Sequence, residues 1–465
     1  MIGLLHPDAR LIEAANGATL GGVDLHDQVA ELGAALDREP PGMVLAAMPT
    51  TVTAVLRFLA ALRVGRPIAL VDPRIDGERL ADLADRFCPA VLFGDAESLP
   101  GYRPGPDQRL GDYQRRTGDP GPAPHPDLAL LLATSGSTGS PKLVRLSRAA
   151  VLANAAAIGA ALEIDGDEVA PTSLPLHYTF GLSVLTSHLH AGATVVVEEN
   201  AFTTRDFWSN VDRHHVTSLA AVPYQYEMLR RLRFDPARYP RLRTLTQAGG
   251  RLNPDLVEDF HRRMAAVGGR FFVMYGQTEA TARMAVLPAD RLPAKLGSVG
   301  VPVRGGEITV SPGDGPETTE PGRTGEIVYR GANVMMGYAE TAADLARGDD
   351  LGGVLRTGDL GRLDDEGFLY ITGRIKRIAK IFGVRVNLDD VERSLARHGP
   401  VAAVAGPDRL VLVAEGADDD RLARIRAEAA EELGTHSSGI LVRSVDALPL
   451  TTTGKPDYRA LEDQC

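Results

Sequence analysis

The first part of the chain alternates short apolar runs with stretches in which apolar residues recur at helical spacing. Met43–Met48 is a continuous apolar run, which predicts a buried strand, and Thr51–Leu62 follows with the period of a helix. Ile68–Val71 predicts the next strand. Alternating strands and helices are typical of a parallel sheet that is covered by helices.

The same alternation resumes after a segment that is rich in proline and glycine. Residues 100–126 hold seven prolines and five glycines, which predicts a surface connection rather than a regular element. We expect strands at Leu128–Leu132, Ala193–Val197 and Val216–Val222, and helices at Ala149–Leu162, Phe202–His214 and Tyr224–Leu232.

Beyond residue 297 the pattern changes to short strands between Gly/Pro turns. Glu307–Val310, Gly325–Tyr329 and Gly367–Ile371 are such strands, and they predict a small antiparallel sheet or barrel. From about Gly373 onward, helical and strand patterns alternate again in a separate α+β unit. We therefore expect an N-terminal domain over residues 1–373, a hinge at 374–376 and a C-terminal domain over 377–465.

Length, composition and charge narrow the class of protein. A chain of 465 residues is too long for one ordinary core, and 44% hydrophobic with 24% charged residues is typical of a globular protein. The net charge of −11 argues against a general nucleic-acid binder. No apolar run is long enough to span a membrane, and the N-terminus lacks the pattern of a secretory signal. Two cysteines, Cys88 and Cys465, make no disulfide framework, so we expect a cytoplasmic protein.

The segment Ala133–Lys142, with the sequence ATSGSTGSPK, is the most informative feature for function. It follows the apolar run Leu128–Leu132 and combines hydroxyl side chains, two glycines and a lysine. Glycines let the backbone approach an anion, while free N–H groups, hydroxyls and an ammonium group bind it, so the segment predicts a polyphosphate site. It does not match the common nucleotide loop G-x-x-x-x-G-K-[ST], because Lys142 follows proline and precedes leucine.

Three further segments, Tyr275–Glu279, Arg356–Asp359 and Thr452–Lys455, complete the pattern. In this order and at these separations, the four segments resemble those of the adenylate-forming (AMP-binding) superfamily of acyl-CoA synthetases, adenylation enzymes and luciferases. The resemblance covers most of the chain. It implies an α/β fold: a large N-terminal domain of two doubly wound α/β subdomains plus a small β-barrel, then a small α+β lid. It also implies ATP and Mg²⁺ as cofactors.

The resemblance assigns most nucleotide contacts residue by residue. It implies that the β- and γ-phosphates are bound by Thr134, Ser135, Gly136, Ser137, Thr138, Gly139 and Lys142. Tyr275 and Gly276 would contact adenine and its surroundings, Thr278 the α-phosphate, and Glu279 the Mg²⁺ ion, which prefers carboxylate oxygen. Asp359 would accept the ribose hydroxyls, with Arg374 beside the ribose.

The same resemblance implies a lid that turns between two half-reactions. Lys455 would reach the α-phosphate and the substrate carboxylate during adenylation. Lys376 would be the hinge, and Lys380 and Gly383 would face the active site during thiol transfer, with Gly383 beside the thiol tunnel. The usual isoleucine before the lysine is Ala379 here. Arg377 fits a solvated charged face.

Pro175–Leu182 resembles the acid-pocket segment of the family, with Tyr178 at the position of a gating aromatic residue. His177 either belongs to this pocket or is a core histidine. The pocket would also be lined by Phe180, Gly181, Val222, Ala248, Gly249 and Gly250. Amino-acid-activating relatives have an aspartate that pairs with the substrate ammonium, and Gly181 is assigned to that place. A buried ammonium without a partner is costly, so we expect an uncharged aryl or fatty-type acid instead of an amino acid.

The acceptor of the acyl group stays open at this point. CoA is the favoured co-substrate, which predicts an acid–thiol ligase of the acyl-CoA synthetase type. An acyl carrier protein, an amine, or the oxygen chemistry of a luciferase would use the same adenylate. A catalytically inactive nucleotide-binding module is the third alternative, and the intact Lys142, Glu279, Asp359 and Lys455 argue against it.

Overall fold

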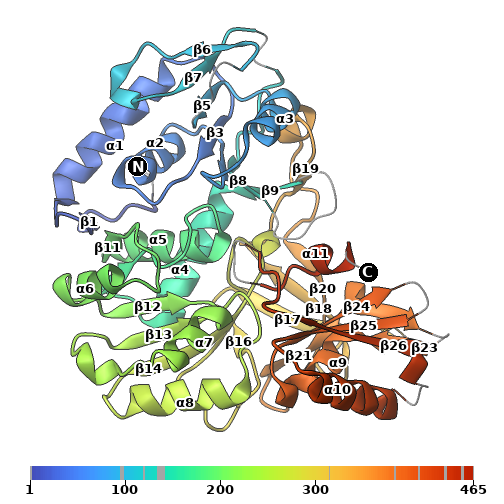
Figure 1. The fold of residues 1–465 in the computed structure, drawn as a ribbon. Coiled ribbons are helices and arrows are strands. Elements are labelled where there is room, and N and C mark those ends of the chain that lie inside the picture. The colour runs from blue at the N-terminus through green and yellow to red at the C-terminus, as the bar shows by residue number, and fades with distance from the viewer. Residues whose placement is uncertain are drawn as a thin grey trace. The chain divides into compact units, whose positions relative to one another are not determined.

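The computed structural model describes residues 3–94, 99–118, 121–133, 142–313, 315–381, 384–406, 409–433, 437–451 and 455–463. Its packing divides the chain into two compact units, shown in Figure 1. The first unit comprises Met1–Glu307 and Arg330–Leu355, and the second comprises Ile308–Tyr329 and Arg356–Cys465. The predicted hinge at 374–376 stays a prediction.

An eight-stranded sheet, in the order β19-β9-β8-β4-β3-β5-β7-β6, is the first layer of the first unit. Its centre is parallel, since β3 pairs with β4 and β5, and β4 pairs with β8. The strands are β3 (Val44–Ala47), β4 (Ile68–Val71), β5 (Val91–Phe93), β6 (Tyr102–Pro104), β7 (Gln114–Arg116), β8 (Leu128–Ala133), β9 (Leu143–Ser147) and β19 (Gly337–Ala339). The parallel arrangement predicted from the alternating pattern is confirmed.

Two further sheets belong to the first unit. A four-stranded sheet has the order β10-β11-β1-β2, and a five-stranded sheet has the order β12-β13-β14-β15-β16. The strands are β1 (Arg10–Glu13), β2 (Thr19–Gly21), β10 (Val169–Pro171), β11 (Thr194–Val197), β12 (Ser218–Ala221), β13 (Thr244–Gln247), β14 (Arg270–Tyr275), β15 (Ala285–Leu287) and β16 (Val301–Pro302). β12, β13 and β14 run parallel, so their carboxyl ends lie at one edge of the sheet.

In the described part of the first unit, eight α-helices connect and cover these strands, and several begin where a side chain accepts a backbone N–H. Thr51 caps α2 and Ser147 caps α4 in this way, which satisfies a donor that the first helical turn leaves unpaired. The helices are α1 (Gly22–Asp37), α2 (Val52–Arg63), α3 (Gly77–Phe87), α4 (Arg148–Leu162), α5 (Thr179–Ala191), α6 (Arg205–Arg213), α7 (Pro223–Arg231) and α8 (Pro254–Ala265).

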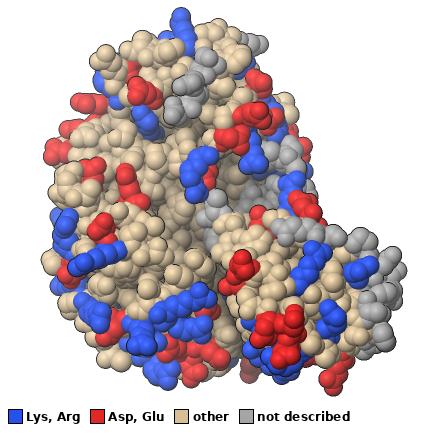
Figure 2. All heavy atoms as spheres, viewed as in Figure 1, with Lys and Arg blue, Asp and Glu red and all other residues tan. Residues whose placement is uncertain are grey.

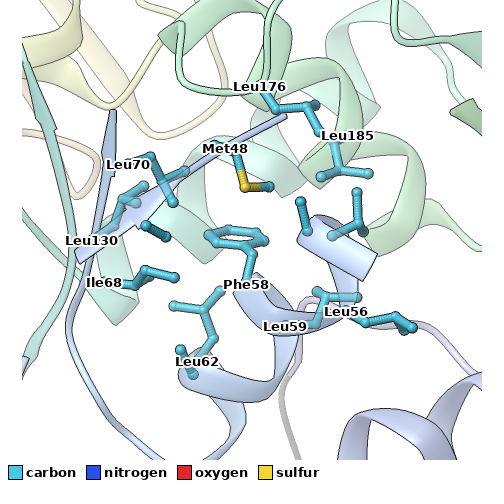
Figure 3. Packing of buried hydrophobic residues seen from close by; sticks show 14 of the residues in the cluster. Met48, Leu56, Phe58, Leu59, Leu62, Ile68, Leu70, Leu130, Leu176 and Leu185 are labelled. Carbon is cyan, nitrogen blue, oxygen red and sulfur yellow. The ribbon is translucent and has the colours of Figure 1, made fainter. Parts of the chain in front are cut away.

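The largest buried cluster lies between the eight-stranded sheet and the helices α2 and α5. Figure 3 shows Phe58 of α2 among Met48, Leu70 and Leu130, with Leu185 of α5 in the same group. Because these apolar side chains come from the eight-stranded sheet and from both helices, their burial holds that sheet and those helices together.

Residues 100–126 differ from the prediction of a plain connection. They contain β6 and β7, which pair antiparallel at the edge of the eight-stranded sheet. Tyr113, just before β7, is buried, and its hydroxyl donates to Glu39 at 2.6 Å. Prolines suit such an edge, because a strand there leaves backbone N–H groups unpaired anyway. The proline- and glycine-rich composition of this segment did not predict these two strands.

The second unit contains the short strands and the C-terminal residues. Its four-stranded sheet has the order β17-β18-β20-β21, and a three-stranded sheet has the order β24-β25-β26. The elements are β17 (Gly306–Ser311), β18 (Gly325–Gly331), β20 (Val354–Leu363), β21 (Leu369–Arg374), β22 (Ile378–Ile381), β23 (Val384–Asn387), α9 (Leu388–Ser394), β24 (Val401–Gly406), β25 (Arg409–Glu415), α10 (Asp419–Glu432), β26 (Ile440–Val445) and α11 (Tyr458–Glu462).

Within the described residues, no helix is both long and apolar enough to cross a membrane. On the face of the molecule in Figure 2, acidic and basic side chains lie interspersed and do not separate into one basic field.

Candidate active site

The turn after β14 carries the first group of predicted site residues. Tyr275 ends β14 as a buried side chain, and Thr278–Ala280 forms a short 3-10 helix. Between them, Gly276 packs against the returning chain so closely that an added Cβ would lie 1.8 Å from the carbonyl oxygen of Ala282. Only glycine fits there, so the motif requires Gly276 for a steric reason.

Hydrogen bonds fix two polar side chains of this turn, those of Thr278 and Glu279. The Thr278 hydroxyl lies 2.8 Å from that of Thr179, the first residue of α5. The Glu279 Oε1 atom accepts a hydrogen bond from the Tyr338 hydroxyl at 2.8 Å. Burial, and then the neighbouring Glu279 carboxylate, raise the pKa of Tyr338, so its phenol stays protonated and donates. The turn therefore presents an oriented hydroxyl and an oriented carboxylate.

Strand β19 connects this turn with Lys142, the last residue of the glycine- and hydroxyl-rich segment. β19 pairs with β9, which begins directly after Lys142. Lys142 Nζ lies 2.6 Å from Oε1 of Glu340, which directly follows β19 and lies two residues beyond Tyr338. Both partners are about half exposed, so this ion pair is weak and a phosphate could take the place of Glu340.

The two residues predicted beside the ribose come together in the second unit. Asp359 of β20 and Arg374 of β21 are register partners, and Arg374 Nε donates to Asp359 Oδ1 at 2.9 Å. Asp359 is buried while Arg374 is exposed. The Thr357 hydroxyl accepts from the Asp359 N–H and donates to the Ile327 carbonyl, which ties the motif to β18. The pairing of β20 with β21 thus places the two residues that the motifs assign to the ribose, Asp359 and Arg374, in direct contact.

The backbone of Lys455 makes two hydrogen bonds with Thr451. The Thr451 N–H donates to the Lys455 carbonyl at 2.7 Å, and the Lys455 N–H donates to the Thr451 hydroxyl at 3.2 Å. Leu450 and Pro456 form a bridge outside this pair. The backbone of the lysine is therefore held at both of its ends.

Arg377 corrects one prediction of the sequence, because its side chain is mostly covered, with 11% of it exposed, instead of solvated. Its guanidinium donates to Asp389, to Glu392 and to the Ala403 carbonyl, and lies 3.8 Å from the centroid of the Tyr458 ring. Burial raises the pKa of Glu392, and the charge of Arg377 opposes that rise. This network joins the residue after the predicted hinge to α9, β24 and α11.

Several predicted residues lie outside the part of the chain that the structure describes. These are Thr134, Ser135, Gly136, Ser137, Thr138, Gly139 and Gly383, and also the side chains of Lys376 and Lys380. Their roles stay predictions.

Most residues predicted for the acid pocket come together. Phe180, Val222 and Ala248 belong to one buried cluster, and Tyr178 packs against it. Gly249 has a φ of +83°, and an added Cβ would lie 2.5 Å from the Tyr178 hydroxyl oxygen. The rings of Tyr178 and Phe180 pack edge to face, with their centroids 6.4 Å apart. Burial raises the pKa of Tyr178 to about 12, so this aromatic group carries no charge at neutral pH.

His177 and Gly181 have different surroundings from those of this cluster. His177 Nε2 lies 3.5 Å from Asp72 Oδ2, and burial lowers the pKa of the imidazole while Asp72 opposes that shift. An added Cβ at Gly181 would lie 2.3 Å from the Pro175 carbonyl oxygen. Gly181 therefore faces the backbone and could not present a carboxylate to a substrate, so its assignment to the aspartate position is not supported. Thr179, directly after Tyr178, is the residue whose side chain reaches Thr278.

Sequence reasoning missed three residues of this region. The motifs assigned no role to Tyr338, Arg283 or Glu340. Arg283 is buried with its guanidinium carbon 4.6 Å from the centroid of the Phe180 ring. Pairing of β19 with β9 joins residues almost two hundred positions apart, and no local sequence pattern encodes it.

A model of the AMP-binding enzyme family matches residues 5–339, well over half of the chain. The chain belongs to this family. It is 28% identical to an oxalate–CoA ligase of Arabidopsis thaliana, across 97% of this chain and 95% of that protein. It is 32% identical to a sulfoacetate–CoA ligase of Cupriavidus necator, across 78% of this chain and 71% of that protein.

Among solved structures, an amide bond synthetase from Marinactinospora thermotolerans aligns with a TM-score of 0.74 and 26% identity, across 97% of this chain and 96% of that chain. The predicted superfamily and its mixed α/β fold are thereby confirmed. The two CoA ligases confirm the predicted class of AMP-forming acid–thiol ligase.

Proposed function

We propose that the protein activates a carboxylic acid with Mg²⁺–ATP and transfers the acyl group to the thiol of CoA. In the first step a carboxylate oxygen attacks the α-phosphorus, the bond to the β-phosphate breaks, and pyrophosphate leaves. In the second step the thiol sulfur attacks the acyl carbon, the bond to AMP breaks, and the thiol proton is released. The carbon skeleton of the acid is aryl or fatty-type.

The observation that carries this proposal is the arrangement around β19. Tyr338 of β19 orients the Glu279 carboxylate, and Glu340, directly after β19, pairs with the Lys142 ammonium. Glu279 suits a Mg²⁺ ion shared with phosphate oxygens, because such ions keep only one or two protein carboxylates. Lys142 would neutralise phosphate charge, and Thr278 would donate a hydrogen bond to the α-phosphate.

Asp359 with Arg374 would bind the ribose, since a carboxylate can accept hydrogen bonds from both hydroxyls. Lys455 would serve the adenylation step as the family resemblance implies. CoA is the acceptor that the names of the two ligases above favour. Likeness to an amide bond synthetase favours an amine as the second candidate acceptor. A cytoplasmic location stays a prediction.

The test is release of pyrophosphate and AMP from ATP over a panel of acids, with and without CoA, followed by mass spectrometry of the product. We expect acyl-CoA to form, and Glu279→Ala to lower the rate of pyrophosphate release at least about a hundredfold. Glu31→Ala, which removes an exposed carboxylate from α1, is the matched control. Amide formation with an added amine, without thioester formation, would replace CoA by the second candidate. No pyrophosphate release with any acid would refute adenylation.

The acids named for the two relatives share one chemical property. Oxalate and sulfoacetate each carry a second anionic group besides the carboxylate that is activated. This differs from the uncharged acid that the pocket segment predicts, so the charge of the substrate is the open question of the proposed function.

A further inference from the structure

Arg283 follows the turn of Tyr275–Glu279 and is held rigidly. It is buried, with 3% of its surface exposed. The side chain of Asn154 accepts from the Arg283 N–H at 3.1 Å and donates to its carbonyl at 2.8 Å. Asn333 donates to the same carbonyl at 3.0 Å. Because both asparagines are themselves buried, these hydrogen bonds fix the backbone of Arg283, from which its side chain extends.

The guanidinium borders the residues that form the candidate acid pocket. It lies over the Phe180 ring, and Nη2 donates to the Ser183 hydroxyl at 3.3 Å. The Ser183 hydroxyl itself donates to the Phe180 carbonyl, so it is free to accept from the arginine. Arg283 Nε is buried and makes no hydrogen bond among the described residues. The Nε–H group of the Arg283 guanidinium therefore lacks an acceptor among these residues, although it lies close to Phe180.

The charge of Arg283 also lacks a counter-ion. Burial lowers the pKa of its guanidinium to about 10, so it stays a cation at neutral pH. Within the described residues, no carboxylate lies within 4.0 Å of it. Arg145, another fully buried arginine, makes an ion pair with Asp350 at 2.5 Å and donates to three backbone carbonyls. A buried cation without a partner is unfavourable, and an anion would relieve that cost.

We propose that Arg283 binds a second anionic group of the acyl substrate, so that the acid carries a carboxylate or a sulfonate away from the carboxylate that is activated. This inference rests on the proposed function and specifies its substrate class. The planar guanidinium presents paired donors that match either group, with the Phe180 face behind it. The expectation of an uncharged acid considered only the missing carboxylate at Gly181 and overlooked this cation.

The test compares acids of equal length that differ at the distal end, which is a methyl group, a carboxylate, a sulfonate or, as a fourth arm, an ammonium. Aliphatic series from two to eight carbons and an aryl pair cover the skeleton. The readout is kcat/KM for pyrophosphate release, expressed as the ratio of each charged acid to its methyl partner. A ratio within one variant cancels losses of folded enzyme or of general activity.

In the wild type we expect at least about a thirtyfold preference for the distal anion, the scale of a buried ion pair. Arg283→Met should remove this preference and favour the methyl acids, whereas Arg283→Lys should retain part of it. Arg66→Met removes another buried arginine, whose guanidinium donates to the Glu39 carbonyl and has no part in the proposed site, and it should leave the ratio unchanged. The carboxylate and sulfonate arms tell which anion fits better.

Equal use of methyl and anionic acids by the wild type would overturn the inference, and so would an unchanged ratio in Arg283→Met. If Arg283→Met does not fold, the wild-type ratio alone decides. If the wild type converts methyl-ended acids into their CoA thioesters and shows no preference for a distal anion, the proposal about Arg283 is refuted and the proposed function stands. Absence of pyrophosphate release with every acid would refute the proposed function as well.

Discussion

Replacing Tyr338 by phenylalanine should weaken the use of Mg²⁺ by a predictable amount. The change removes one hydroxyl and keeps the ring, so the lost interaction is the 2.8 Å hydrogen bond to Glu279 Oε1. A hydrogen bond to a charged group contributes about 1.5–3 kcal/mol. Tyr338 is 39% exposed, so water can partly replace the hydroxyl, and we take the lower limit, about 1.5 kcal/mol. That free energy corresponds to roughly a tenfold change.

The loss should be seen in metal affinity, because a group that orients a metal ligand acts through that ligand. Removing such a partner typically costs about 10- to 100-fold in metal affinity or activity. The assay is pyrophosphate release at saturating acid and ATP over a series of Mg²⁺ concentrations. For Tyr338→Phe we expect the half-saturating Mg²⁺ concentration to rise about tenfold, with a near-normal rate at high Mg²⁺. For Glu279→Ala we expect a loss of at least about a hundredfold that high Mg²⁺ does not restore.

Tyr226→Phe is the matched control, because its hydroxyl also makes one hydrogen bond, to the Thr246 carbonyl at 2.9 Å, but lies in the core. This variant should be less stable and keep the Mg²⁺ dependence of the wild type. An unchanged Mg²⁺ curve for Tyr338→Phe would refute the reasoning about orientation. Near-normal activity of Glu279→Ala at saturating Mg²⁺ would refute the assignment of Glu279 itself.

Three further predictions concern stability and the lid. Burial lowers the pKa of His188 to about 4, so the unfolded chain takes up a proton that the folded protein rejects, and stability should fall as pH decreases from about 6.5 to 4. By pH 5 the free energy of unfolding should have fallen by about 2 kcal/mol. In urea unfolding, the free energy of unfolding of His188→Gln should depend less steeply on pH than that of the wild type. Gly181→Ala should lower the melting temperature, at a cost of about 1–3 kcal/mol, because its Cβ would lie 2.3 Å from a carbonyl oxygen; an unchanged melting temperature would contradict that packing. Lys455→Ala should abolish adenylate formation yet still transfer the acyl group from pre-made acyl-adenylate, and Gly383→Leu should do the opposite; equal loss of both half-reactions in both variants would exclude an alternating lid.

The sequence by itself determined the family, the α/β pattern and the main nucleotide-binding motifs. These features are local, because a motif such as Tyr275–Glu279 and the period of a helix are both written in consecutive residues. Gly276 illustrates this well: its place in the motif is visible in the sequence, and the packing against Ala282 supplies the reason for it.

Only the tertiary structure decided which side chains share a neighbourhood. Tyr338 and Glu340 reach Glu279 and Lys142 because β19 pairs with β9. Arg377 is mostly covered because residues of α9, β24 and α11 contact its guanidinium. Gly181, which the sequence assigned to the acid pocket, faces the backbone. Arg283, to which the sequence assigned no role, places a cation without a counter-ion among the described residues over the Phe180 ring. Such contacts join residues far apart in the chain, and their energies depend on burial and distance, which residue order alone does not specify.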